Sequence, residues 1–260
     1  MKKGVIISDL HCGHLVGLTP PPWQSSGDGW REKVREAQHQ AWDWFDREMA
    51  KLGKLDVLIC NGDAVDGDGH RSGGTEQIST DPTVQAEIAT YILQRYMSRK
   101  TKLFMTYGTP SHTGTLFDTE GLIARDCGAE KIEGQAFLDI EGVVFDIKHK
   151  IGSSGVPHGR ATALKKAQLW NKLWNYAQEQ PDADVVIRSH VHYHQFAGDP
   201  DFGLAMTTPA LQACGSKYGS RQCEGRIHFG FISFQCDKGE FSWKSHIAKL
   251  EAHKSTASVV

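Results

Sequence analysis

The pattern of apolar and polar positions predicts alternating strands and helices over the first half of the chain. Short runs rich in β-branched residues indicate strands, and apolar residues three or four positions apart indicate helices. Strands are expected at residues 4–8, 56–60 and 102–107. Helices are expected at 30–52, from Pro82 to about residue 99 with Asp81 as N-cap, and at 116–126.

The second half of the chain is richer in strands. Residues 136–140 and 143–149 flank Glu141-Gly142 and are typical of a hairpin. A helix at 160–179 and strands at 184–188 and near 203–208, 226–235 and 240–247 are expected to follow. β–α–β units followed by antiparallel strands predict an α/β fold of two packed mixed β-sheets flanked by helices.

The composition limits the class of protein but indicates no specific chemistry. The chain has 260 residues and a formal net charge of −2, which fits one domain over residues 1–248 followed by a polar, frayed tail at 249–260. This near-neutral charge gives no sign of a long duplex-binding surface. No segment is long enough to span a bilayer, and the apolar run after Met1 is too short for a signal peptide. We expect a cytoplasmic protein without a membrane partner; the sequence does not define its oligomeric state.

Four groups of aspartates and histidines follow the predicted strands. They are Asp9-Leu10-His11, Asn61-Gly62-Asp63, His149, and His190-Val191-His192. Ligands gather beyond the carboxyl ends of strands in open α/β sheets, so these groups are expected to converge. With one residue between its members, each Asp-x-His or His-x-His pair should place both side chains on one side of an extended segment. Carboxylates and imidazoles bind divalent metals, and one carboxylate can bridge two ions. The pattern predicts a two-metal site.

The order of these motifs resembles that of the calcineurin-like metallophosphoesterases. The resemblance covers about residues 4 to 195, and the opening Asp-Leu-His-Cys-Gly-His with its following prolines is similar to phage- or prophage-encoded members. It implies a four-layer α/β/β/α sandwich. It also implies a ligand set in which Asp9, His11 and His192 bind one metal ion, His149 and His190 bind the other, and Asp63 bridges the two.

The third motif of that family is altered in this chain. The family has Gly-Asn-His followed by Asp or Glu, whereas this chain reads Gly108-Thr109-Pro110-Ser111-His112. Thr109 stands in the place of the asparagine ligand, and its hydroxyl offers only a weak neutral oxygen. His112 then either binds the metal or donates a proton to the leaving group, and we favour the proton donor.

The resemblance implies a metal-dependent phosphoesterase, a hydrolase in which a metal-bridging hydroxide attacks phosphorus. A phosphodiester is the expected substrate, either nucleic acid or a nucleotide. A phosphomonoester, from a phosphoprotein or a small molecule, is the alternative. A non-catalytic binding module on the same fold is the competing hypothesis. Two divalent ions are expected, manganese first and iron, zinc or nickel as alternatives.

Two further sets of residues are candidates for substrate contacts. His14 and Arg160 suit phosphate oxygens, with a solvated loop side chain as the alternative interpretation for each. The second set consists of tryptophans that could stack on nucleic-acid bases, although their helical spacing favours packing in the core. These are Trp30, Trp42, Trp44, Trp170 and Trp174.

Overall fold

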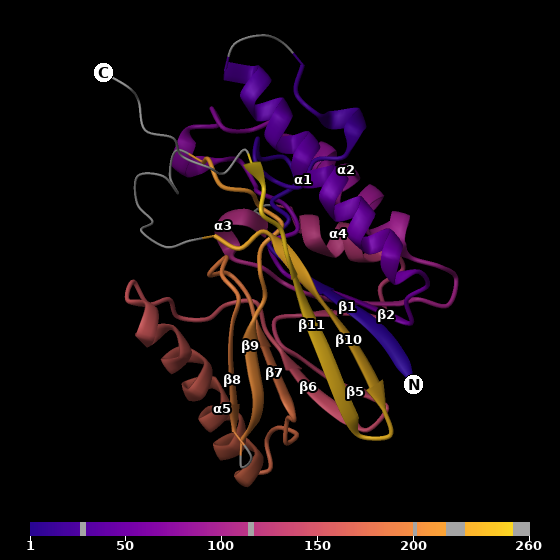
Figure 1. Ribbon diagram of the computed structural model, residues 1–260, viewed down its shortest axis with the longest axis vertical. Helices are drawn as coiled ribbons and strands as arrows, with labels where there is room; N and C mark the ends of the chain where they lie inside the picture. The colour runs from indigo at the N-terminus through magenta and orange to yellow at the C-terminus, as the bar shows by residue number, and fades with distance from the viewer. Residues whose placement is uncertain (27–29, 114–116, 200–201, 217–226, 252–260) are drawn as a thin grey trace.

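The computed structural model describes residues 1–26, 30–113, 117–199, 202–216 and 227–251 (Figure 1). Its strands form two mixed sheets. The first has the order β11-β10-β1-β2-β3-β4, in which β1 to β4 are parallel and β10 and β11 are antiparallel. These strands are β1 (Lys2–Ile7), β2 (Val57–Asn61), β3 (Lys102–Thr106), β4 (Lys131–Glu133), β10 (Gly230–Asp237) and β11 (Glu240–Ile247).

The second sheet has the order β5-β6-β7-β9-β8. Its three central strands are parallel, and both edge strands are antiparallel to their neighbours. The strands are β5 (Ala136–Ile140), β6 (Val143–Ile147), β7 (Val185–Arg188), β8 (Gln195–Asp199) and β9 (Gly203–Thr207). The helices are α1 (Trp30–Leu52), α2 (Pro82–Tyr96), α3 (Pro110–Thr113), α4 (Thr119–Asp126) and α5 (Arg160–Tyr176). Short 3-10 turns cover Pro21–Trp23, His70–Ser72 and Pro157–Gly159.

Alternation along the strands explains how these elements stack into layers. In β1, Val5 and Ile7 pack against the helices α1, α2 and α4, whereas Ile6 packs against the second sheet. Leu164 of α5 packs against the other face of that second sheet. Successive strand residues point to opposite faces, so apolar runs fill the layers on both sides. The four-layer α/β/β/α arrangement, with two mixed sheets flanked by helices, is confirmed.

Most element predictions are confirmed, with shifts of a few residues at their ends. Asp81 caps α2 by accepting a hydrogen bond from Thr83 N, but the helix ends at Tyr96 because Met97 is extended. β4, β8 and α3 were not predicted, because each is short and has no clear apolar period. Residues 116, 226 and 252–260 of the predicted helix, strand and tail lie outside the described part of the chain. None of the described helices combines the length and apolar character needed to cross a bilayer.

The tryptophans divide into two groups. Trp42 is buried and Trp44 packs against the same core, as predicted. Trp170 and Trp174 do not pack in the core; they are 49% and 41% exposed, so that prediction is wrong for them. The reason is that α5 buries Leu164 together with two polar residues, Gln168 and Asn171, and turns its bulky apolar residues outward. The side chain of Trp30 lies outside the described set.

Candidate metal centre

The six predicted ligands all lie in the turns that directly follow strands. Asp9 and His11 follow β1, Asp63 follows β2, His149 follows β6, and His190 and His192 follow β7. The first sheet therefore contributes three ligands and the second contributes three. The turns are joined by backbone hydrogen bonds from Asp9 N to Gly62 O, 3.0 Å, and from Ser189 N to His149 O, 2.8 Å.

The backbone at these turns is left-handed rather than extended. Of the six residues, all but His149 have a positive φ, with values from 46° to 73°. The predicted extended geometry of the Asp-x-His and His-x-His pairs is therefore wrong, because β1 and β7 end before the motifs begin. Asp and His tolerate this conformation better than most side chains, yet each such residue costs about 1–3 kcal/mol.

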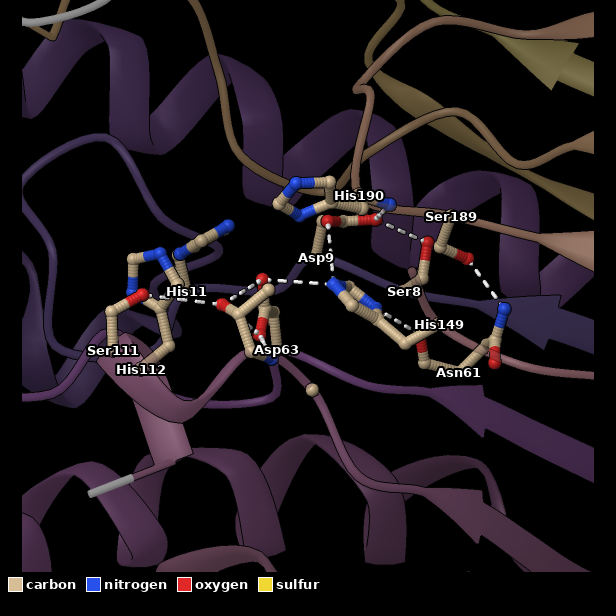
Figure 2. Close-up of polar contacts among 12 residues, drawn as sticks. Ser8, Asp9, His11, Asn61, Asp63, Ser111, His112, His149, Ser189 and His190 are labelled. Carbon is tan, nitrogen blue, oxygen red and sulfur yellow. Dashed lines mark hydrogen bonds and ion pairs between the residues drawn. The ribbon is translucent and has the colours of Figure 1, made fainter. Parts of the chain in front are cut away.

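The six side chains form two clusters of potential ligand atoms, and His11 also belongs to a third group with Asp66 and His112. One consists of Asp9, His11 and His192, and the other of Asp63, His149 and His190. Within each cluster one ligand atom from every residue lies within 4.8 Å of the others. Figure 2 shows Asp63 between the ring of His11 and the ring of His149. The structure thus brings all six residues together, with Asp63 grouped with His149 and His190; that Asp63 bridges two ions stays a prediction.

Asp9 lies between the two clusters. Its Oδ1 atom is 3.2 Å from His192 Nε2 and 3.9 Å from His149 Nε2, and it has no hydrogen-bond partner although it is fully buried. Burial opposes ionisation of Asp9, but the nearby histidines outweigh it and lower the pKa of this carboxyl to about 2. A buried carboxylate is costly unless its charge is compensated, and here the two histidine rings supply that compensation in the metal-free chain.

His149 leads to the same conclusion. Its Nδ1 is 2.7 Å from the carbonyl oxygen of Asn61 and must donate to it, which leaves the lone pair on Nε2 in the neutral ring. That Nε2 is buried, makes no hydrogen bond, and lies 3.0 Å from Asp63 Oδ2. Burial works against a charged ring, yet Asp63 and Asp9 raise the pKa of His149 to about 9. In the metal-free chain these atoms contact only the opposite charges of neighbouring ligand residues, and the Asp and His donors gathered there fit divalent metal ions.

Asp66 orients the ring of His11. Its Oδ1 lies 2.7 Å from His11 Nδ1, and its Oδ2 accepts from Gln77 Nε2 at 2.5 Å. Because the carboxylate can only accept, His11 carries its proton on Nδ1 and presents the lone pair of Nε2 to the cluster, 3.3 Å from His192 Nε2. Ligating histidines are commonly fixed in this way by a carboxylate on the second nitrogen.

Thr109 and His112 occupy different places in the altered third motif. The backbone N–H of Thr109 donates to Asp63 Oδ1 at 2.6 Å, and its hydroxyl donates to the same oxygen at 3.1 Å. His112 instead lies beside His11, with ring centroids 4.6 Å apart, and its Nδ1 donates to Asp66 O at 2.9 Å. Thr109 therefore orients Asp63, and His112 has Nε2 free next to the first cluster.

A chain of hydrogen bonds beneath the ligands has only one consistent direction. Ser8 donates to Asp9 Oδ2 at 2.7 Å, so it must accept from Thr208, which in turn must accept from Ser189. Ser189 accepts from the amide of Asn61 at 2.6 Å, and the Asn61 oxygen accepts from Thr106. Every donor thus points toward Asp9. Sequence position indicated Ser8, Asn61 and Ser189, which precede ligand motifs, but nothing indicated Thr208.

Glu120 is a second feature without a sequence signal. It comes from α4 and is fully buried. Its Oε1 accepts from Ala64 N at 3.0 Å and its Oε2 from Gly108 N at 2.7 Å, which ties together the loops that carry Asp63 and Thr109. Burial, reinforced by Asp63, raises the pKa of Glu120 to about 7.

The two predicted substrate contacts lie in different surroundings. His14 is buried, with 6% of its surface exposed, and its Nδ1 accepts from Val16 N at 3.0 Å. Arg160 begins α5, and its guanidinium lies over the ring of Tyr193, 4.3 Å from the centroid, directly after His192 in the chain. Contact with substrate stays a prediction for both residues; Arg160 is half-buried against Tyr193, the residue after His192.

No family model matches the chain, and no curated protein matches it. Among solved structures it is similar to an archaeal phosphodiesterase (16% identity, TM-score 0.48, 94% of this chain and 99% of that chain). It is also similar to the zinc complex of Vps29 from Entamoeba histolytica (13% identity, TM-score 0.45, 95% of this chain and 98% of that chain). A third similar structure is a metallophosphoesterase from Sphaerobacter thermophilus (13% identity, TM-score 0.42, 96% of this chain and 89% of that chain). Similarity at this level gives no basis for assigning an activity, which is inferred below from the residues of the chain.

Proposed function

We propose that this protein is a dinuclear metal-dependent phosphoesterase that hydrolyses phosphodiesters of nucleic acid or nucleotides. The observation that carries the proposal is the pair of adjacent ligand clusters, in which the buried atoms Asp9 Oδ1 and His149 Nε2 make no hydrogen bond and contact only charged groups of other candidate ligands. Asp9, His11 and His192 would hold one ion. His149 and His190 would hold the other ion, and Asp63 would bind both ions. Bound divalent ions at such a site polarise phosphate oxygens and lower the pKa of water.

The residues of the chain have distinct parts in this proposal. Asp66 and Asn61 fix the tautomers of His11 and His149, so that each presents a lone pair rather than a proton to the centre. Thr109 holds the carboxylate of Asp63 in place through two donors. Arg160, next to the His192 turn, is proposed to bind a phosphate oxygen through its guanidinium.

His112 is proposed to move a proton at Nε2 between the first cluster and the leaving oxygen. Its Nδ1 is engaged with Asp66 O, so Nε2 is the atom available for exchange. Burial, reinforced by the charge of His11, lowers the pKa of His112. A neutral ring would accept a proton at Nε2 from the attacking water and pass that proton to the leaving oxygen.

Metal content and turnover of two esters test the proposal. The full chain is stripped with chelator and resupplied with manganese, iron, zinc or nickel. Bis-p-nitrophenyl phosphate is expected to be hydrolysed faster than p-nitrophenyl phosphate. The reverse preference would indicate a monoesterase. An absence of turnover for both esters with every metal would leave a binding module and refute the enzymatic proposal.

A matched pair of variants tests the assignment of Asp63. Asp63→Asn removes the charge shared by both clusters and is expected to lower metal content and turnover at least about 100-fold. Asp43→Asn, on the exposed face of α1, makes the same chemical change far from the clusters and should behave like the unaltered chain. Full activity in Asp63→Asn would disprove the role of Asp63 as a shared ligand.

A further inference from the structure

A groove of about 680 Å³ lies between α5 and the outer face of the second sheet, separate from the ligand clusters. One wall comes from Asp146 of β6, Arg188 of β7 and the segment that follows β6, and the other comes from one side of α5. This volume is in the range of sites that hold a nucleotide-sized ligand. Nothing in the proposed metal chemistry uses this groove.

The charge of the groove is positive. Lys148, Lys150 and Lys166 line it, and none of the three has an ion-pair partner among the interactions described for this part of the chain. Among the described residues that line the groove, the only carboxylate is Asp146, and it is neutralised by a two-point contact with Arg188 at 2.7 and 3.2 Å. The groove therefore suits a polyanion rather than a basic or neutral surface.

The aromatic content of the groove narrows the choice of polyanion. Trp170 and Trp174 line it with their rings stacked, centroids 6.2 Å apart and planes 27° apart, and nearly half of each side chain is exposed. Exposed tryptophans beside lysines form the combination that binds single-stranded nucleic acid, in which bases stack on rings and cations follow the phosphates. An acidic protein would satisfy the lysines but would leave the two indole faces without stacking partners.

The groove also adjoins the metal centre along the chain. Lys148 and Lys150 are the two neighbours of His149, and they are exposed whereas His149 is buried. Arg188 is likewise one residue from Ser189 and the His190 turn. The same two segments therefore present imidazoles to the clusters and cations to the groove.

We propose that this groove binds a single strand of DNA or RNA, with bases on Trp170 and Trp174 and phosphates on Lys148, Lys150 and Lys166. If the bound strand is also the substrate, its phosphates would reach the ligand clusters past His149. That part of the inference rests on the proposed function. The binding itself depends only on the groove.

Binding of short oligonucleotides to the full chain as purified tests this proposal. Fluorescence anisotropy is measured with end-labelled thymidine and uridine strands of about ten nucleotides, the size range of such sites, with phosphorothioate links that resist hydrolysis. Either strand should bind and quench tryptophan emission, and their relative affinities distinguish DNA from RNA as ligand. A strand of equal charge without bases should bind at least 10-fold more weakly. Three lysines predict a slope of log affinity on log salt of about −2.

Matched variants locate the binding. Trp170→Ala should weaken binding roughly 5- to 150-fold, the range measured for stacking of one base. Leu173→Ala, an exposed position of the same helix outside the groove, should not change it. Lys166→Ala should weaken binding and reduce the salt slope by about 0.7, whereas Lys172→Ala, also on α5, should do neither.

The outcomes separate the groove from the metal chemistry. Turnover of bis-p-nitrophenyl phosphate without strand binding would overturn the groove proposal alone, and strand binding without turnover would overturn only the proposed function. Equal binding by strands with and without bases, or binding unaffected by Trp170→Ala and Lys166→Ala, would also overturn the groove proposal. So would a dimer in sedimentation that Trp170→Ala converts to monomers, because the groove would then bind a second copy.

Discussion

Replacement of Asp66 by asparagine isolates the contribution of one charge to the metal centre. In the unaltered chain His11 Nδ1 lies 2.7 Å from an oxygen of Asp66. Asparagine keeps the shape of this side chain, and its amide oxygen can still accept the hydrogen bond from His11 Nδ1. The amide nitrogen then faces Gln77, whose buried Oε1 has no partner and can accept from it once the Gln77 amide rotates. Geometry is preserved while the negative charge is lost.

The size of the effect follows from what that charge does to His11. Without it, Nε2 of His11 is a weaker base and a weaker ligand, and loss of such a partner typically costs 10- to 100-fold in metal affinity. This corresponds to about 1.4–2.7 kcal/mol of binding free energy. Asp66→Ala should cost more, because His11 then loses the acceptor that fixes its tautomer.

The metal-free chain offers an independent measurement. Burial lowers the pKa of His11, but the hydrogen bond and charge of Asp66 outweigh this and raise it overall. Burial raises the pKa of Asp66, but His11 outweighs it and lowers it. The pair therefore stabilises the fold above the ordinary carboxyl pKa of 3.8 and below the ordinary imidazole pKa of 6.5. The difference in unfolding free energy between the unaltered chain and Asp66→Asn should shrink outside that window.

Calorimetric titration with manganese or zinc gives the affinity, and urea unfolding at several pH values gives the stability. Asp68→Asn is the control, because Asp68 is exposed in the same loop and, among the contacts of the described residues, accepts a hydrogen bond from His70 N alone. A metal affinity of Asp66→Asn within twofold of the unaltered chain would refute the reasoning, and so would an equal loss in Asp68→Asn.

Three further changes test the architecture around the ligands. Gly62→Ala should destabilise the fold by at least about 2 kcal/mol in urea unfolding, because Gly62 has a φ of 77° and a Cβ there would lie 2.6 Å from the His149 ring. Ser189→Ala should cost about 1–3 kcal/mol in thermal unfolding, because Asn61 Nδ2 then keeps only a 3.3 Å bond to Lys148 O. Glu120 has a folded pKa of about 7 against an ordinary 4.5, so in chelated protein its contribution to stability should fall by about 3 kcal/mol as pH rises from 4.5 to 7. Glu120→Gln should remove that part of the pH dependence, measured as the difference between the two unfolding curves.

Exposed positions supply the controls for these changes. Gly134→Ala is the control for Gly62→Ala, because it places a methyl group in open space. Ser242→Ala and Glu130→Gln, at exposed positions, are the controls for Ser189→Ala and Glu120→Gln. Effects of equal size at these positions would show that the variants report general sensitivity rather than the contacts described.

The sequence predicted which Asp and His residues come together, because strand ends can be located from apolar runs. A strand buried on both faces, such as β2, needs an uninterrupted apolar run, and the first polar residues after it mark the edge of the sheet. The backbone of the turns was not predictable in the same way. Left-handed conformation is usually indicated by glycine, whereas here Asp and His adopt it.

Contacts that are made only by tertiary packing also could not be predicted from the sequence. Thr208 and Glu120 come from segments without a motif, and their partners are set by how the sheets and α4 dock. The exposure of Trp170 and Trp174 was mispredicted for a related reason. Helical spacing identifies an apolar stripe but not the layer it faces, and α5 places the buried Gln168 and Asn171 on the inner side.

The split of the ligands between two sheets determines when the metal centre can form during folding. His11 and His192 are 181 positions apart, and each cluster contains residues from both sheets. The first cluster needs β1 and β7, the second needs β2, β6 and β7, and both need the two sheets to be docked, so we expect ions to bind only after the folding barrier has been crossed. Interactions absent from the transition state slow unfolding and leave the folding rate unchanged. Metal supply should therefore lengthen the lifetime of the folded chain without speeding its formation.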